Sequence, residues 1–198
     1  EIRGAGNLLG DEQSGHVAAL GFELYMQMLD EAVAAASEEE GDELPEPVRL
    51  DVNVDAYVPA DYISYEQAKI EVHRRIAGAR EVSELAELRD ELVDRFGDPP
   101  EPLENLLLLQ QARIKFGQAG ARAISFRGDL LAVTPVDLEP DAAEELKRRL
   151  ENAAYEPGRS QLTVRVPREP EKRFRTVVAA ADALLAVTVG EPVAAAAA

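Results

Sequence analysis

Apolar residues recur every three or four positions over much of the chain, a spacing typical of amphipathic helices. The first such stretch, residues 16–36, predicts a helix that packs by one face, with its acidic residues elsewhere. Its apolar stripe consists of Val17, Leu20, Leu24, Met28 and Ala32. Residues 1–15 precede it with four glycines, which predict a loop.

The period changes to two over residues 50–58. One side of this stretch is apolar, with Leu50, Val52, Val54, Ala56 and Val58, and the other side carries Asp51, Asn53, Asp55 and Tyr57. Side chains of a strand alternate between faces, so the pattern predicts a half-buried strand.

Three helices are predicted next. Ser64 and Gln67 have the spacing of a capping box, which predicts that a helix begins there. A second helix begins at Ser83, and Gly97 followed by two prolines ends it. A third begins near Pro102 and ends near Gly117 and Gly120. The predicted inward positions of the three helices are Tyr65, Ala68, Val72, Ile76 and Ala79, then Leu85, Leu88, Leu92 and Phe96, then Leu103, Leu106, Leu107 and Ile114.

Short apolar runs follow, and they predict strands mixed with helices. Residues 123–126 and 130–134 form a predicted hairpin around Gly128, and residues 161–166 a further strand. Helices are predicted over residues 141–152 and 171–185. The fold class is therefore α+β: an N-terminal loop and long helix, then a compact domain of a helical cluster plus a small mixed sheet.

Residues 37–47, SEEEGDELPEP, favour neither helix nor strand and mark the domain boundary. We accordingly divide the chain into residues 1–36, an acidic linker over 37–47, a domain over 48–190 and an Ala-rich tail over 191–198. Because the sequence has no initiator Met, we expect it to come from a longer protein.

Composition indicates a globular protein, with 46% hydrophobic and 30% charged residues. The absence of Cys excludes disulfides and thiol chemistry and agrees with a cytoplasmic location. The apolar stretch 177–189 is interrupted by Asp182 and is too short to span a bilayer. A net charge of −17 should repel duplex DNA, so a basic protein surface is the expected partner.

Candidate binding sites are weak. The glycines of residues 1–15 lack the third Gly of a dinucleotide fingerprint, since Leu9 stands there, and the sequence contains no phosphate-loop motif. Asp51, Asn53 and Asp55 imitate the start of a calcium loop, but Ala56 and Tyr62 replace its required Gly and Glu, which favours a solvated strand face. The acidic run 38–43 is interpreted as a solvated linker rather than a magnesium site.

Catalytic groups are equally sparse. His16 and His73 are far apart, and nothing in the sequence joins Ser14 to a triad. For His73 a surface or partner-facing position is favoured over catalysis. The one basic concentration, which cannot all face one way, is a solvated face or a docking patch; it consists of Arg165, Arg168, Lys172, Arg173 and Arg175.

The opening EIRGAGNLLGDEQSG resembles the end of the translocation motif shared by transcription-repair coupling factors and the branch-migrating helicase RecG. The likeness to the coupling factors continues through GFELYMQMLDEAV, AYVPADYI, RRIAGA and ELRDELVDRFGDPP, whereas the likeness to RecG stops near the motif. The resemblance therefore favours the coupling factors over roughly the first 120 residues.

This resemblance implies roles that the residue pattern alone does not give. Arg3 and Gln13 would couple ATP hydrolysis to movement along DNA, with Gly4, Gly6, Gly10 and Gly15 completing the motif. The domain after the linker would be regulatory and would dock on a UvrB-like module of the same protein.

The parent protein would bind ATP, Mg, duplex DNA, RNA polymerase and UvrA. The present chain would have no catalytic residues, no cofactor or metal of its own, and no direct contact with DNA. The alternatives are a catalytic or DNA-binding part of a RecG-like helicase, and a structural module that completes the motor.

Overall fold

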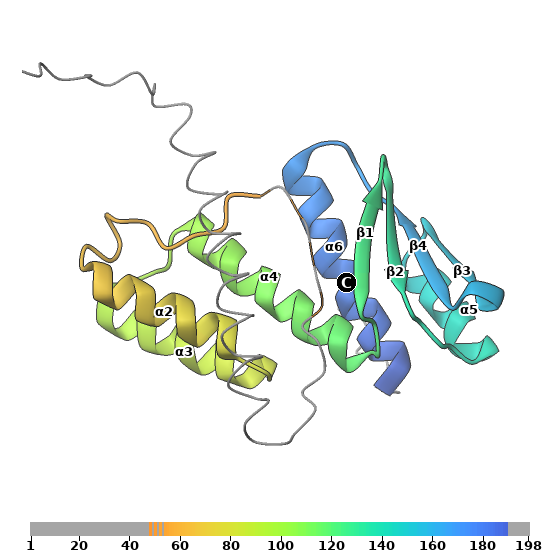
Figure 1. Cartoon of the computed structure of the whole chain (residues 1–198), viewed down its shortest axis with the longest axis horizontal. Helices are drawn as coiled ribbons and strands as arrows, with labels where there is room; N and C mark the ends of the chain where they lie inside the picture. The colour runs from red at the N-terminus through yellow and green to blue at the C-terminus, as the bar shows by residue number, and fades with distance from the viewer. Residues whose placement is uncertain (1–47, 49, 51, 53, 190–198) are drawn as a thin grey trace, which may run out of the picture.

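The structure is a computed structural model that describes residues 48, 50, 52 and 54–189. It shows helices and strands in an α+β arrangement (Figure 1). They are α2 (Glu66–Gly78), α3 (Val82–Phe96), α4 (Glu101–Gln118), β1 (Ala123–Arg127), β2 (Leu130–Thr134), α5 (Pro140–Arg149), β3 (Ala153–Glu156), the 3-10 turn η1 (Pro157–Arg159), β4 (Gln161–Arg165) and α6 (Pro170–Val189). The α+β prediction is confirmed for this part of the chain.

The four strands form one sheet in the order β1-β2-β4-β3. Every neighbouring pair is antiparallel, so the sheet is not the mixed one that we expected. The hairpin prediction is confirmed, and Gly128 takes a left-handed φ of 64° in its turn. Strand β3 was not predicted, and the expected helix over 141–152 ends three residues earlier, at Arg149.

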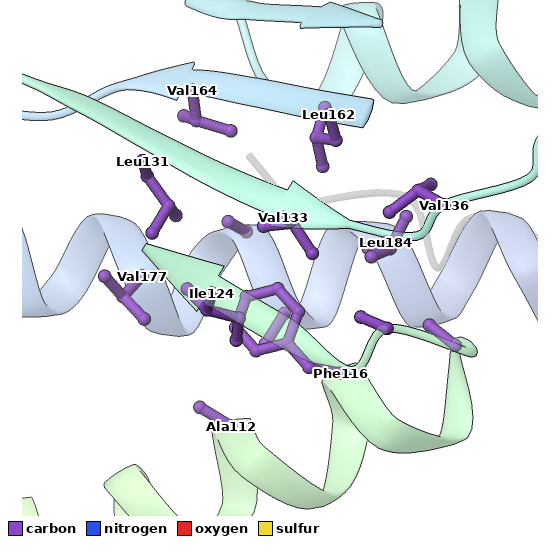
Figure 2. Close-up of a cluster of buried hydrophobic side chains, with 14 of the residues drawn as sticks. Ala112, Phe116, Ile124, Leu131, Val133, Val136, Leu162, Val164, Val177 and Leu184 are labelled. Carbon is purple, nitrogen blue, oxygen red and sulfur yellow. The ribbon is translucent and has the colours of Figure 1, made fainter. Parts of the chain in front are cut away.

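One face of the sheet carries the apolar side chains. Ile124, Val133 and Leu162 lie opposite one another on β1, β2 and β4 and are at most 6% exposed. Helices α4, α5 and α6 contribute to the same buried cluster, which we call the sheet cluster. Figure 2 shows side chains from α4, α6 and three strands meeting in it.

A second buried cluster, the helical cluster, lies among α2, α3 and α4. Helix α4 belongs to both clusters: Leu103 is buried in the helical cluster and Phe116 in the sheet cluster, each 0% exposed. Figure 1 shows α4 running from the α2–α3 pair towards the sheet. The two halves of the domain are therefore joined by one continuous helix.

The predicted capping box does not form. Helix α2 begins at Glu66, and Tyr65 occupies its N-cap position without a side-chain cap bond. Tyr65 was expected to face inward but is 78% exposed, because it lies before the first helical turn and not within the helix. The predicted inward positions of α3 and α4 are confirmed as buried or, for Phe96, partly buried.

The predicted strand over residues 50–58 is wrong, although its alternation is real. Ala56 and Val58 are buried and Tyr57 is exposed, yet none of the described residues of this stretch belongs to a strand. Helix α4 holds the stretch instead: Asn105 Nδ2 donates to the Asp55 carbonyl oxygen at 3.1 Å, and the Tyr57 N–H donates to the Pro102 carbonyl at 3.1 Å. Alternating burial shows that one side of an extended stretch is covered, and a helix can cover it as well as a neighbouring strand can.

Candidate docking surface

The residues that the resemblance assigns to a translocation motif lie outside the described part of the chain. They are Arg3, Gly4, Gly6, Gly10, Gln13 and Gly15. The predicted helix over 16–36, the acidic linker over 37–47 and the Ala-rich tail over 191–198 lie there as well. The described domain is therefore where the structure can reveal a functional surface.

The exposed side of α2 and α3 carries a network of ion pairs that joins the two helices. Glu91 of α3 accepts a hydrogen bond from Arg75 of α2 at 2.7 Å and another from Arg95 of α3 at 2.9 Å. The pKa of Glu91 lies below its ordinary value, chiefly because Arg75 and then Arg95 donate hydrogen bonds to the carboxylate. Because the three side chains remain accessible to water, a partner's charges could replace these contacts at little cost.

The helical period explains why these charges face outward. Leu85, Leu88 and Leu92 recur on one side of α3 and are buried in the helical cluster. Glu91 and Arg95 are four residues apart, so they lie on one face of the helix and can pair with each other. The buried leucines therefore fix the direction in which the network points.

A second ion pair holds α3 against α4. Arg89 donates to Glu104 through Nε at 2.9 and 3.2 Å and through Nη2 at 2.6 Å, a forked contact that fixes both side chains. The hydrogen bond to Glu104 is also the main reason that the pKa of Arg89 is raised. The orientation of α3 on the domain is thus fixed beside the Arg75–Glu91–Arg95 network.

A groove of about 390 Å³ lies next to this network, between the end of α2 and the beginning of α3. Arg74 and Glu71, which pair at 2.6 Å, line it together with Arg75. Ile70, one turn before Arg74 on α2, is 46% exposed. The surface of α2 and α3 therefore combines arginines and carboxylates around the groove with an exposed apolar side chain, Ile70, elsewhere on α2, and arginine is enriched in protein interfaces.

His73 lies on α2 but is only partly exposed. Its pKa is lowered, first because burial disfavours the charged ring and then because Lys69 lies near. The neutral ring is thus the favoured form near neutral pH, and the ring is partly exposed on α2, where the sequence favoured a surface or partner-facing position. His16 lies outside the described residues.

Residues proposed for metal or basic sites are spread over the domain. No group of three His, Asp or Glu side chains within the described residues is placed to hold a metal ion, and Asp55 is exposed. The basic concentration does not point one way: Arg173 lies over the Phe126 ring, whereas Arg165 pairs with Asp129 on the exposed side of the sheet. Within 48, 50, 52 and 54–189, no helix is both long and apolar enough to cross a membrane.

Comparisons with known proteins agree on one family. A family model described as the TRCF domain matches residues 52–146. The transcription-repair-coupling factor of Staphylococcus haemolyticus is 42% identical over 147 residues, which are 73% of this chain and 12% of that protein. The corresponding factor of Mycobacterium tuberculosis is 37% identical over 179 residues, 85% of this chain and 14% of that protein.

A crystal structure of the C-terminal domain of a transcription-repair coupling factor shares the fold. Its TM-score is 0.60 at 18% sequence identity, and the match covers 74% of this chain and 96% of that one. The present chain spans only 12–14% of the length of the two relatives above.

Sequence reasoning assigned no docking residues, although it favoured a surface or partner-facing position for His73, which Arg74 and Arg75 follow. The Glu91–Arg95 pair was accessible to it, because a Glu four residues before an Arg on a predicted helix is a recognised stabilising pattern. Arg75 is 16 residues from Glu91 and belongs to another helix, so only the packing of α2 on α3 brings it there.

Proposed function

The chain carries the C-terminal domain of the transcription-repair coupling factor family, and on that premise we propose that it is a regulatory, autoinhibitory domain of a DNA-translocating ATPase. In this proposal the parent protein displaces stalled RNA polymerase and recruits nucleotide excision repair. ATP and Mg are bound by the motor, and Arg3 and Gln13 belong to that motor. The domain itself performs no catalysis and acts by docking on a UvrB-like module of the same polypeptide.

The Arg75–Glu91–Arg95 network is the observation that supports docking most directly. It places two arginines and one carboxylate side by side on an exposed surface that two helices share. Exposed ion pairs contribute little to folding, which leaves them free to exchange partners. An accessible, mixed-charge surface of this kind favours specific and reversible association.

Docking within one polypeptide can inhibit without high affinity. A tethered partner is present at an effective concentration in the millimolar range for short flexible linkers, so a weak contact is occupied most of the time. Binding of UvrA or RNA polymerase to the parent can then compete with the docked state. The domain would in this way hold the motor quiet and cover the surface that recruits UvrA.

The test reverses charge at the centre of the network in the full-length parent. We expect E91R to raise the parent's ATPase rate and its UvrA binding, because Arg75, Arg95 and the new arginine would repel the docked module. The double variant R75E/E91R restores opposite charges between α2 and α3, so it should keep the fold. Because the two charges have exchanged positions, it should remain undocked, which would show that the effect of E91R is not caused by unfolding.

A control reverses charge elsewhere. Arg148 is an exposed residue of α5 with one ion pair, to Glu145, and lies outside the α2–α3 surface. R148E should leave ATPase rate and UvrA binding unchanged. If E91R behaves like R148E while circular dichroism shows both folded, the docking surface is assigned wrongly.

The structural alternative has its own experiment. Removal of the chain after about residue 50 from the parent should activate ATP hydrolysis and expose the UvrA site if the domain inhibits. Unchanged ATPase rate and unchanged UvrA binding would instead favour a module that only completes the motor. Robust ATP turnover or duplex binding by the present chain alone would favour the helicase reading.

A further inference from the structure

Among the described residues, the side of the sheet that faces away from the sheet cluster carries exposed side chains, Ser125, Arg127 and Arg165 among them. Its central row, which the register places side by side, contains only small residues: Ser125, Ala132, Thr163 and Ala154. The row nearest the β1–β2 turn is different, because it contains Arg127, Leu130 and Arg165. All three are exposed, and Leu130, 37% exposed, lies between the two arginines.

The turn beside this row is held by several contacts. The Arg173 guanidinium lies 3.9 Å from the centroid of the Phe126 ring, and its Nη2 donates to the Gly128 carbonyl at 3.2 Å. The Val166 N–H donates to the Asp129 carbonyl at 2.8 Å. The beginning of α6 and the end of β4 are therefore fixed against the turn, and the charges around it are preorganised.

The positive charge at this end is only partly neutralised. We call Arg127, Arg165 and Arg168 the hairpin-tip arginines; Arg168 follows two residues after Val166, whose N–H donates to the Asp129 carbonyl in the turn. Arg165 pairs with Asp129 at 3.0 Å, whereas Arg127 and Arg168 make no ion pair with the described residues. All three side chains are exposed. A protein with a net charge of −17 thus carries at this end exposed arginines, two of which make no ion pair with the described residues.

We propose that the hairpin-tip arginines bind the chain's own acidic segment, residues 37–47, and so fix the domain relative to whatever precedes it. The segment carries six carboxylates within residues 38–46, against no basic residue. Tethering makes this contact intramolecular, which favours it over the same contact between separate molecules. The inference does not depend on the proposed docking of α2 and α3.

The chain is long enough for this contact. Val48 lies beside the end of α4. Its side chain packs next to Gly117, and its carbonyl accepts a hydrogen bond from Arg113 Nε at 2.9 Å. From there to Glu38 is ten residues, or about 33 Å when extended. Strand β1 begins just after α4 and reaches the tip over five residues, about 17 Å. The acidic segment can therefore pass the edge of β1 and reach the arginines.

Nucleic acid fits this surface less well. This face of the sheet presents no aromatic side chain on which a base could stack, since its outward positions on the four strands are Ala, Ser, Thr, Leu, Arg, Gln and Glu. Glu156 and the acidic remainder of the chain would also repel phosphates. An acidic polypeptide carries the same attraction without needing stacking.

The experiment uses the full 198-residue chain and its lack of cysteine. S37C provides a single thiol for a nitroxide spin label beside the acidic segment. We expect the label to cause loss of amide NMR signal for Arg127, Gly128 and Arg165. The loss should disappear when the acidic segment is neutralised by E38Q, E39Q, E40Q, D42N and E43Q, and at about 1 M salt, where screening acts within about 3 Å.

Matched variants locate the basic partner. R127Q removes a tip arginine that has no ion pair to lose, and it should reduce the signal loss. R159Q removes an exposed arginine of η1 and should not. Signal loss that survives R127Q and neutralisation, or that is confined to the neighbourhood of Arg122 at the other end of β1, would overturn the proposal.

Two other occupants give distinct results. To detect contacts between copies, chain that carries the spin label but no 15N is mixed with 15N-labelled chain that carries no spin label. Signal loss at the tip in that mixture would assign the surface to a second copy. A 20-base-pair DNA duplex is added in a separate titration. If it shifts the NMR signals of the tip amides more strongly than neutralisation of the acidic segment does, the surface is assigned to nucleic acid. Either result contradicts the intramolecular contact.

Discussion

Gln110 of α4 is the buried polar residue of the described domain, at 9% exposed. Its Nε2 donates to the carbonyl oxygens of Ala77 at 3.4 Å and Ala79 at 3.2 Å. Carbonyls at the C-terminal end of a helix have no partner within the helix, so a side chain from outside must satisfy them. Gln110 thereby ties the end of α2 to α4.

We predict that Q110L lowers the free energy of unfolding by about 1–3 kcal/mol, because it leaves these buried carbonyls without their donor. Urea unfolding followed by circular dichroism measures the change. Q111L, at the neighbouring and partly exposed position, should change stability much less. Equal effects of the two substitutions would mean that the hydrogen bonds to α2 contribute nothing.

Two glycines at helix ends should respond oppositely to alanine. Gly97 ends α3 with φ 86° and ψ −168°, a conformation that only glycine adopts readily, so G97A should cost about 1–3 kcal/mol. Gly78 lies in the last turn of α2 with nothing within 4 Å of an added Cβ, so G78A should stabilise by about 0.4–1 kcal/mol. Thermal unfolding of both variants measures the opposite signs; a shift in the same direction would contradict the assignment.

The pKa of Glu91 gives a pH-dependent prediction. Its folded-state pKa is depressed below the ordinary value of 4.5, so its contribution to stability is present above that value and is lost as pH falls through the folded pKa. E91Q should therefore be less stable than the original chain at pH 7, and the difference should shrink towards pH 3. Urea midpoints from pH 3 to pH 7 provide the measurement. E87Q, at an exposed α3 position without an ion pair in the described domain, should show no such convergence.

At the scale of elements, α4 decides how the domain holds together. It supplies Leu103 to the helical cluster and Phe116 to the sheet cluster, and it packs against α3 and α6. A helix with buried residues on more than one side lacks a clear amphipathic stripe. The sequence of α4 therefore predicted a helix but did not show that it packs into two separate clusters. Neither cluster can lose α4 and keep its core.

We predict that the two clusters unfold together. L92A removes a side chain from the helical cluster and L162A one from the sheet cluster, and each should cost about 2–5 kcal/mol. Because α4 is common to both clusters, each variant should shift a single calorimetric transition whose calorimetric and van't Hoff enthalpies agree. Two separate transitions in either variant would show that the halves are independent.

At the scale of the whole molecule, the negative charge is unevenly distributed. Residues 1–47 contain 12 of the 38 acidic residues but only one of the 21 basic residues. The described domain is consequently far closer to neutral than the net charge of −17 suggests. The expectation that the chain repels duplex DNA therefore rests largely on its first 47 residues, and the domain itself has room for surfaces of either sign.

The sequence by itself determined the α+β class and most element positions. Helical spacing of Leu85, Leu88 and Leu92, the stop at Gly97 and the turn at Gly128 are local features, because each depends on the period or the backbone freedom of neighbouring residues. The family likeness was equally accessible, since it is carried by continuous stretches of sequence. Where local rules compete, prediction failed: the helix expected to reach residue 152 ends at Arg149, β3 was not predicted, and Ser64 did not cap α2.

Only the tertiary structure decided which residues meet. Alternation over residues 50–58 showed that one side is covered but could not show that α4, and not a strand, covers it. Arg75 meets Glu91 across two helices, and strand register places Leu130 between Arg127 and Arg165. These contacts depend on helix packing and strand register, which are set by burial of the whole apolar surface at once and not by any local stretch of the chain.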